Sequence, residues 1–315
     1  MTHAMFRGLS AFPITPADPH GQVDTGALVG LVQRLAAAEV DSIGLLGSTG
    51  TYAYLTRAER RRAVEAAAGC LGGRVPLIVG AGALRTDDAQ DLARDAEAAG
   101  AAGLLLAPVS YTPLTEEEVL QHFAAVAEAT NLPLCIYNNP ATTHFTFSDA
   151  LVERLAKIPG VTAVKNPAPP PAEAQARHEA LRARVPGSFA IGYSGDWNAP
   201  DAILAGGDAW YSVVGGLLPE PTLKLLRAAQ AGDVAEVARW NGRLQPLWDL
   251  FKELSSLRVM YAAADILGIC RTEPPRPILP LPPDAYRRVA AALEVLDADD
   301  RQPCPTPNGR MSAFR

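Results

Sequence analysis

Short apolar runs alternate along the chain with longer segments in which apolar residues recur at helical spacing. Eight short runs predict strands at residues 9–12, 42–46, 75–80, 102–107, 132–137, 161–165, 189–192 and 209–213. The segments that follow them predict helices at roughly 24–38, 56–72, 86–100, 115–130, 147–157, 172–184, 197–206 and 219–231. Two of these helices begin with a Ser/Thr-x-x-Glu capping pattern, at Thr56 to Glu59 and at Thr115 to Glu118.

Eight strand–helix units in a row predict parallel strands with helices packed outside them. Eight is also the number that closes a (β/α)₈ TIM barrel at about this length, and we assign the barrel to residues 1–231. The alternative is an open, doubly wound sheet. We disfavour it because no Gly-x-Gly-x-x-Gly turn follows an early strand and eight units would make a large open sheet.

The pattern becomes purely helical after the barrel, which predicts a C-terminal helical extension over residues 232–298. Its apolar face comprises Trp240, Leu244, Leu247, Leu250, Phe251, Leu254 and Leu257. Such a face requires a partner, so we expect it to pack on the barrel or on another subunit. Residues 299–315 are polar and rich in proline, and they predict a mobile tail.

The composition excludes several classes of protein. A formal net charge of −6 and a pI of about 5.4 leave no basic surface for nucleic acid. The four cysteines are scattered and the five histidines are isolated, so we expect no disulfide framework, no metal site and no metal cofactor. The chain shows neither a signal peptide nor a membrane-spanning segment, and a cytoplasmic location is expected.

Lys165 is the most informative residue, because it ends a buried strand-like run and is followed by a proline-rich loop at 166–171. The other three lysines, Lys157, Lys224 and Lys252, lie in helical patterns where a lysine is solvated. An ammonium at the end of a buried strand is costly unless it is paired or loses its proton. A neutral lysine attacks carbonyl carbon, which is the chemistry of Schiff-base enzymes. The alternative is a structural lysine held in a salt bridge.

In a (β/α)₈ barrel the active site lies at the carboxyl ends of the strands, and the loop after the second predicted strand carries Gly47-Ser48-Thr49-Gly50. This turn can present backbone N–H groups and two hydroxyls to a carboxylate. The alternative is a capped turn in which Ser48 and Thr49 bond only the local backbone.

Aromatic and glycine residues follow other strands at the same end of the barrel. Tyr111 lies in a proline-bounded loop, and Tyr137 closes the fifth predicted strand with its hydroxyl expected at the rim. Either tyrosine can serve in packing alone, but a suitably placed phenol also acts as an acid or base. Gly195 permits a bend after the seventh strand, and Tyr211 lies near the end of the eighth. A lysine, two phenols and a Ser-Thr turn are what Schiff-base chemistry on a 2-oxo acid requires, with no organic cofactor.

The chain resembles the dihydrodipicolinate synthase / N-acetylneuraminate lyase family of pyruvate-dependent class I aldolases over about residues 8–297. The matching motifs are Phe12-Pro13-Ile14-Thr15-Pro16, Gly47-Ser48-Thr49-Gly50 with Leu55-Thr56, Tyr111, Tyr137-Asn138-x-Pro140, Lys165 and Ser194-Gly195-Asp196. Several motifs agree in order and spacing, and Lys165 follows Tyr137 by 28 residues, as in the family.

The resemblance implies a role for each matching residue. Lys165 would form the Schiff base with pyruvate or another 2-oxo acid, and Tyr137 would be the general acid and base. Ser48 would take part in the proton relay, and Thr49 would bind the carboxylate with it. Tyr111 stands where the family supplies a relay tyrosine to a neighbouring subunit's site. This implies a homo-oligomer, in the family usually a tetramer built as a dimer of dimers.

The resemblance also places Gly47, the Gly195 N–H group and the Tyr211 carbonyl in the lining of the pyruvate site. Hydroxylated substrates could be held by Asp196, Ser212 or Thr142.

The chain departs from the family pattern at several positions. Ser48 stands where threonine is common, Thr51 stands where glutamate is usual, and the loop at 166–171 is unusually rich in proline. Thr142 stands where true dihydrodipicolinate synthases have the arginine that grips the carboxylate of aspartate semialdehyde. Loss of that arginine would remove a charge-assisted pair.

The main hypothesis is therefore a class I lyase, either an aldolase or a dehydratase, acting on pyruvate or a 2-keto-3-deoxy sugar acid. One alternative is 4-hydroxy-tetrahydrodipicolinate synthase, which condenses pyruvate with aspartate semialdehyde. It would need another cation in place of the arginine, and nothing in the sequence places Arg7, Arg85 or Arg177 there. A second alternative is a barrel that binds a 2-oxo acid without turnover.

Overall fold

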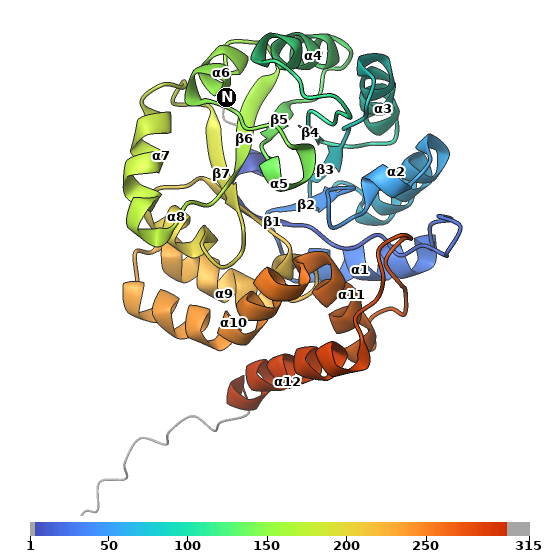
Figure 1. Cartoon of the computed structure of the whole chain (residues 1–315), viewed down its shortest axis with the longest axis vertical. Coiled ribbons are helices and arrows are strands. Elements are labelled where there is room, and N and C mark those ends of the chain that lie inside the picture. Colours follow the sequence, from blue (N-terminus) through green and yellow to red (C-terminus); the bar gives the residue numbers. More distant parts are fainter. Residues whose placement is uncertain (1–3, 301–315) are drawn as a thin grey trace, which may run out of the picture.

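A computed structural model describes residues 4–300 and confirms the predicted barrel, with eight parallel strands closed in chain order and helices around them (Figure 1). The strands are β1 (Gly8–Ala11), β2 (Ser42–Leu45), β3 (Leu77–Gly80), β4 (Gly103–Leu106), β5 (Leu134–Tyr137), β6 (Val161–Pro167), β7 (Ala190–Ser194) and β8 (Ala209–Ser212). Each overlaps its predicted run. The pairing of β1 with β8 closes the barrel.

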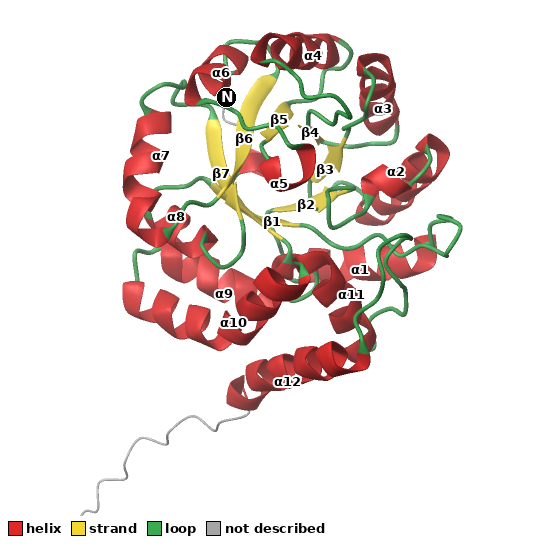
Figure 2. Ribbon diagram, in the orientation of Figure 1, coloured by secondary structure: helices red, strands yellow, loops and turns green. Residues whose placement is uncertain are grey.

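Helices follow the strands as the alternation predicted, and together they form the outer ring (Figure 2). The ring contains α1 (Thr25–Ala37), α2 (Arg57–Leu71), α3 (Thr86–Ala98), α4 (Glu116–Glu128), α6 (Asp149–Leu155), α7 (Ala174–Arg182), α8 (Ala199–Leu204) and α9 (Pro219–Gln230). A short additional helix, α5 (Pro140–Thr143), was not predicted and follows β5. Short 3₁₀ turns occur at Ala4–Phe6, Tyr52–Tyr54, Pro171–Glu173 and Val214–Gly216.

The predicted caps hold, although only one of them is a complete capping box. At α4 the Thr115 hydroxyl accepts from the Glu118 N–H group, and the Glu118 carboxylate accepts from the Thr115 N–H group. At α2 the Thr56 hydroxyl accepts from the Glu59 N–H group. The Glu59 carboxylate instead accepts from the Val23 N–H group at 2.7 Å. The local sequence pattern assigns the Glu59 carboxylate to the cap of α2, but in the structure a residue 36 positions away binds it instead.

The C-terminal extension consists of α10 (Val234–Leu254), α11 (Ser256–Ile266) and α12 (Pro283–Asp300). The prediction of a purely helical pattern is wrong for residues 267–282, which form a loop because prolines lack the N–H group that a helix interior needs. Helix α12 also runs through 299 and 300, which we had placed in the tail. The rest of that tail, 301–315, lies outside the described residues.

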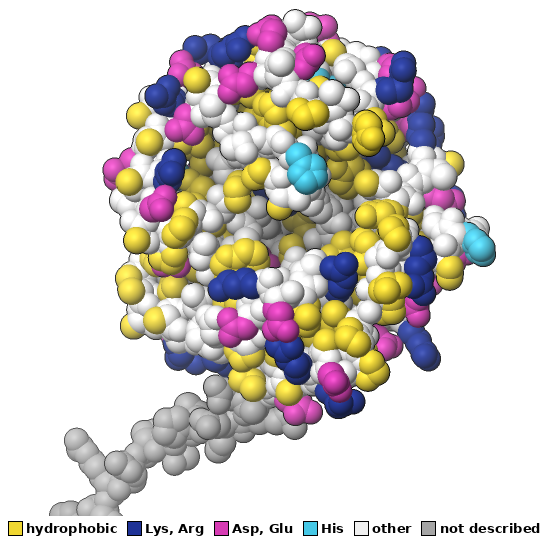
Figure 3. All heavy atoms as spheres, viewed as in Figure 1, with side chains coloured by type: hydrophobic (Ala, Val, Ile, Leu, Met, Phe, Trp, Pro, Cys, Tyr) yellow, Lys and Arg dark blue, Asp and Glu magenta, His cyan; other side chains and the backbone are white. Residues whose placement is uncertain are grey.

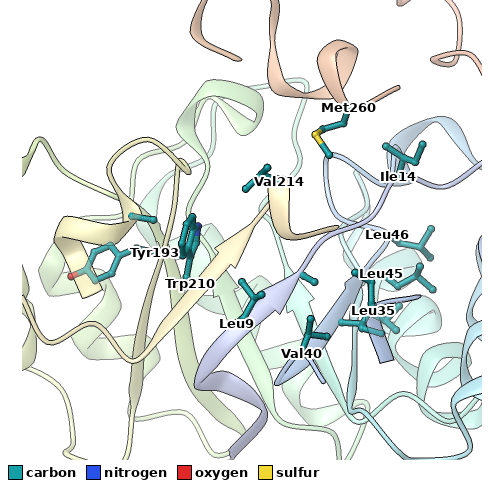
Figure 4. Packing of buried hydrophobic residues seen from close by; sticks show 14 of the residues in the cluster. Leu9, Ile14, Leu35, Val40, Leu45, Leu46, Tyr193, Trp210, Val214 and Met260 are labelled. Atoms are coloured by element: carbon teal, nitrogen blue, oxygen red, sulfur yellow. The ribbon is translucent and has the colours of Figure 1, made fainter. Parts of the chain in front are cut away.

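Two layers of buried side chains hold the barrel together. The larger lies between the strands and the helices and includes Leu9, Leu45 and Trp210, with Met260 of α11 contributing from the extension (Figure 4). The smaller fills the barrel interior and contains Phe12, Tyr137 and Tyr211 among mostly small residues. Burial of these apolar side chains stabilises the fold by roughly 25 cal/mol per Å² removed from water.

Glycines on two strands make room for aromatic rings inside the barrel. A Cβ atom at Gly44 would lie 2.2 Å from the Phe12 ring, and one at Gly192 would lie 2.4 Å from the Tyr211 ring. Any larger residue at either position would displace these rings, because interiors are close-packed. Both rings lie beside Lys165. The two glycines therefore shape the surroundings of the lysine.

Candidate active site

A cavity of about 640 Å³ opens at the carboxyl ends of the strands. In the space-filling view a hollow with hydrophobic side chains on its walls lies near the middle of the visible face (Figure 3). The cavity is lined by Phe12, Ser48, Thr49, Thr51, Tyr52, Ala53, Tyr54, Val109, Tyr137, Asn139, Ala141, Thr142, Lys165, Pro167, Ser194, Gly195, Asp196, Trp197, Val213, Phe251, Ser255, Ser256, Leu257 and Ile278. The predicted residues Ser48, Thr49, Tyr137, Lys165 and Gly195 are thus brought together in one site.

Strand register places Lys165 next to Tyr137. The two residues are paired directly across β5 and β6, and the Asn138 N–H group donates to the Lys165 carbonyl at 3.0 Å. Both side chains line the cavity, and Lys165 is only 4% exposed. The parallel ladder therefore sets the spacing between the amine and the phenol.

Aromatic rings surround the Lys165 amine. Its Nζ atom lies 3.8 Å from the centre of the Phe12 ring, 4.4 Å from that of Tyr137 and 5.6 Å from that of Tyr211. Contact with ring faces stabilises an ammonium in part through the ring quadrupole. Among the ion pairs of residues 4–300 none involves Lys165, so the alternative of a lysine held in a salt bridge is wrong. The amine instead faces the cavity.

A chain of hydrogen bonds beside the lysine links the loop after β2 to the end of β5. The Ser48 Oγ and Tyr137 Oη atoms are 3.1 Å apart, and either can donate. The Asn139 amide donates to the same phenol oxygen at 2.9 Å. The Asn139 amide therefore orients the phenol oxygen, and the phenol can exchange a proton with the Ser48 hydroxyl, which a proton relay requires. Sequence analysis did not identify Asn139, whose position two residues after Tyr137 was the available signal.

The other predicted binding residues occupy different depths of the site. Thr49 lines the cavity, while Gly47 lies beneath it, where a Cβ atom would meet the Phe12 ring at 2.7 Å. Gly195 lines the cavity with a φ of +87°, a conformation that glycine adopts without strain. Gly47 therefore permits close packing of the turn and does not contact the cavity itself.

Tyr211 and Tyr111 lie outside the cavity lining. The Tyr211 side chain is fully buried, and burial raises the pKa of its phenol well above the usual value. Its hydroxyl lies 3.5 Å from the Cys135 sulfur, and burial raises the pKa of that thiol to about 12. Tyr111 is 97% exposed. Within the described chain, the Tyr111 phenol does not reach the cavity.

Three residues that we had considered for hydroxylated substrates have other partners. The Ser212 hydroxyl accepts from the Gly215 N–H group at 2.9 Å, and the Thr142 hydroxyl donates to the Asn139 carbonyl at 3.3 Å. Asp196 accepts from the Trp210 indole at 2.8 Å, and from the N–H groups of Val213 at 3.1 Å and Val214 at 2.8 Å. Burial raises the pKa of the Asp196 carboxyl, and these donors oppose the shift. Asp196 therefore holds the turn after β8.

Asp196→Ala is expected to destabilise the protein by about 3 kcal/mol, because three donors, two of them on buried residues, would lose their acceptor. Urea denaturation followed by circular dichroism measures the change. Asp249→Ala, on the exposed face of α10, is the control and should change stability by less than about 0.5 kcal/mol. Equal stability of the two variants would show that Asp196 does not hold the turn.

The wall beside α5 carries Thr142 and no cationic side chain, and Lys165 is the only lysine or arginine that lines the cavity within the described chain. Arg7, Arg85 and Arg177 do not line it. A further arginine, Arg60, is buried beneath the site and donates to the carbonyls of Gly80 and Gly82. Burial lowers the pKa of Arg60 to about 10, so it stays charged at neutral pH.

Residues 4–300 offer neither a metal-binding cluster nor a membrane-spanning helix. These residues contain no cluster of three or more His, Cys, Asp or Glu side chains that could hold a metal ion. In the same range, no helix combines the length and apolar character that crossing a membrane requires.

Comparison with known sequences finds a family model and named relatives that match most of the chain. A family model described as the dihydrodipicolinate synthetase family matches residues 5–296. A 4-hydroxy-tetrahydrodipicolinate synthase from Phenylobacterium zucineum is 33% identical, over 93% of this chain and 98% of its own length. One of the same name from Methylococcus capsulatus is 35% identical, over 82% of this chain and 88% of its own length.

Solved structures show the same similarity. The crystal structure of a dihydrodipicolinate synthase from Agrobacterium tumefaciens is 63% identical, with a TM-score of 0.91, and the match covers 93% of this chain and 98% of that one. A chloride-inhibited dihydrodipicolinate synthase from Acinetobacter baumannii complexed with pyruvate is 28% identical, with a TM-score of 0.84. That match covers 92% of this chain and 98% of the other.

Proposed function

Because this chain belongs to the dihydrodipicolinate synthetase family and is a lyase of that family, we propose that it joins pyruvate to an aldehyde through an imine on Lys165. The observation that carries the proposal is the buried Lys165 amine, which faces the cavity beside Tyr137 without an ion pair among the described residues. The relative from Acinetobacter baumannii was crystallised with pyruvate, which supports pyruvate as the 2-oxo acid.

The proposed reaction uses the hydrogen bonds that connect Ser48, Tyr137 and Asn139. The neutral Lys165 amine adds to the keto carbon of pyruvate, and the resulting carbinolamine loses water to give the imine. Tyr137 supplies the proton that leaves with the water, and Ser48 passes protons to and from the phenol. Loss of a proton from the methyl carbon gives an enamine, which adds to the aldehyde. Ser48 and Thr49 hold the pyruvate carboxylate.

Aspartate semialdehyde is the first acceptor to test, because the curated relatives are named 4-hydroxy-tetrahydrodipicolinate synthase. The comparisons favour this activity over our main hypothesis from the sequence. A hydroxylated aldehyde, corresponding to a 2-keto-3-deoxy sugar acid, is the second candidate. The observation that favours it is the cavity lining, in which Thr142 replaces the arginine and Lys165 is the only described cation.

Borohydride trapping tests the imine. Reduction in the presence of pyruvate should leave a pyruvyl adduct on the peptide that contains Lys165, as read by intact and peptide mass spectrometry. The acceptor is then identified from pyruvate consumption with aspartate semialdehyde and with D-glyceraldehyde. An adduct with consumption only in the first case supports the synthase, and consumption only in the second supports a sugar-acid aldolase. A folded protein that gives no adduct contradicts the proposal.

The proposal includes a role for Tyr111 at a neighbouring subunit's site, as the family resemblance implies. The support is its near-complete exposure in a loop at the same end of the barrel as the cavity. A homo-oligomer, in the family arrangement a dimer of dimers, would provide that neighbour. Analytical ultracentrifugation of the full chain measures the assembly directly.

A further inference from the structure

A second cavity, of about 440 Å³, lies where the C-terminal extension meets the barrel. It shares no lining residue with the active-site cavity. Its walls come from α11, from the loop at 267–282, from α12 and from residues 17–19 between β1 and α1, which lie beside that loop (Figure 1). The volume is within the range of roughly 300–1,000 Å³ that is usual for sites of small molecules.

Hydrogen bonds between distant segments hold the walls of this second cavity in place. The Thr272 hydroxyl donates to the Ala17 carbonyl at 3.2 Å and accepts from the Ala17 N–H group at 3.4 Å. The Tyr286 hydroxyl donates to the Asp265 carboxylate at 2.7 Å and thereby joins α12 to α11. The loop at 267–282 and α12 are thus fixed around the cavity.

Two arginines, Arg258 of α11 and Arg271 of the loop, line the second cavity without a partner. Within residues 4–300, neither guanidinium group makes a hydrogen bond or an ion pair. By contrast, Arg287 and Arg288, which are exposed on α12, each pair with a carboxylate. Arg258 is half-buried, and a charged group that loses part of its hydration without gaining a partner costs free energy. An anionic ligand in the cavity would offset that cost.

Three carboxylates also line the second cavity, and each of them is engaged. Asp18 accepts from two backbone N–H groups of its own loop at 2.8 Å, and Asp265 accepts from Tyr286. Glu273 pairs with the third arginine of the lining, Arg276, at 3.6 Å. The acidic and basic side chains of the lining balance in charge, so net charge does not draw anions into the cavity. Binding of an anion therefore depends on direct contact with the two unpaired guanidinium groups.

We propose that this second cavity binds the phosphate group of a small phosphate ester through Arg258 and Arg271. The planar fork of a guanidinium group matches pairs of phosphate oxygens. A carboxylate fills one such fork, whereas a phosphate monoester has three terminal oxygens and engages two forks. Tyr261, Tyr286 and Leu281 also line the cavity and suit the carbon skeleton of the ester. The site is separate from the proposed lyase chemistry and does not depend on it.

Conservative substitutions separate the guanidinium fork from its charge. Arg258→Lys and Arg271→Lys each keep the positive charge and lose the fork. Arg287→Lys, on α12 outside the cavity lining, is the matched control. The probes are glucose 6-phosphate and inorganic phosphate, with glucose as the uncharged comparison. Isothermal titration calorimetry of the full chain gives the Kd of each probe, and circular dichroism checks the fold of each variant.

We expect wild-type protein and Arg287→Lys to bind both phosphates and not glucose, and each of the two cavity variants to bind both phosphates about tenfold more weakly. Lys165→Ala should bind them as wild-type protein does, because Lys165 lines the other cavity. The proposal is overturned if wild-type protein binds neither phosphate, or if both cavity variants bind as tightly as wild-type protein. Loss of binding in Lys165→Ala would also overturn it, because the phosphate would then occupy the active site.

Discussion

Lys165→Ala is expected to reduce turnover by at least about 10⁴-fold and to abolish the adduct that borohydride traps with pyruvate. Lys165 is the only lysine among the described residues that line the cavity. Alanine leaves no side-chain nitrogen to form the imine. The substitution should leave the secondary structure unchanged, because Lys165 makes no ion pair with another described residue. Pyruvate consumption, peptide mass spectrometry and circular dichroism measure the three effects.

Lys157→Ala is the matched control for this prediction. Lys157 lies on the surface, where it pairs with Glu153 at 3.0 Å, and exposed pairs of this kind contribute little to stability. This variant should keep both turnover and the adduct. If Lys165→Ala remained active while folded, the Schiff-base mechanism would be wrong. If both variants lost activity, the loss could not be assigned to the Lys165 amine.

Tyr137→Phe should lower kcat by about 10²- to 10³-fold, the usual contribution of a positioned acid or base. Phenylalanine keeps the ring that contacts the Lys165 amine and removes only the oxygen that bonds Ser48 and Asn139. Imine formation should therefore slow without being abolished. The rate at which borohydride traps pyruvate over time measures this step apart from full turnover.

Tyr193→Phe is the control for loss of a buried phenol. Tyr193 is as buried as Tyr137, but its hydroxyl bonds His178 at 3.0 Å and it does not line the cavity. We expect this variant to keep kcat within about twofold while losing about 1 kcal/mol of stability with the hydrogen bond. Equal losses of kcat in both variants would mean that Tyr137 contributes through packing and not as an acid or base.

The sequence predicted the elements well where the signal was local. The alternation of strand and helix patterns determined the barrel, because parallel strands buried on both faces are apolar runs and the helices between them need an apolar stripe. The same reasoning predicted that Ser48, Tyr137, Lys165 and Gly195 would meet, since all of them end or follow strands. Proline content in 267–282 was also a local signal, and we gave it too little weight when we predicted an uninterrupted helical pattern.

Contacts between distant parts of the chain were not predictable in this way. Asp196 was open to interpretation as a substrate ligand until Trp210 and the turn after β8 were seen to surround its carboxylate. Arg60 likewise reaches from α2 to the carbonyl of Gly80 at the end of β3, 20 residues away. Side-chain partners of this kind depend on distances that no spacing along the chain encodes.

The sequence by itself therefore determined the architecture and the nucleophile, because periodicity and strand ends are properties of neighbouring residues. Only the tertiary structure decided the outline of the cavity. It placed Ser255, which lies between α10 and α11, in the lining of the cavity although Ser255 is 90 residues from Lys165 along the chain, and it left Tyr111 exposed. The physical reason is that packing of the extension on the barrel, and not local propensity, determines which side chains reach the substrate.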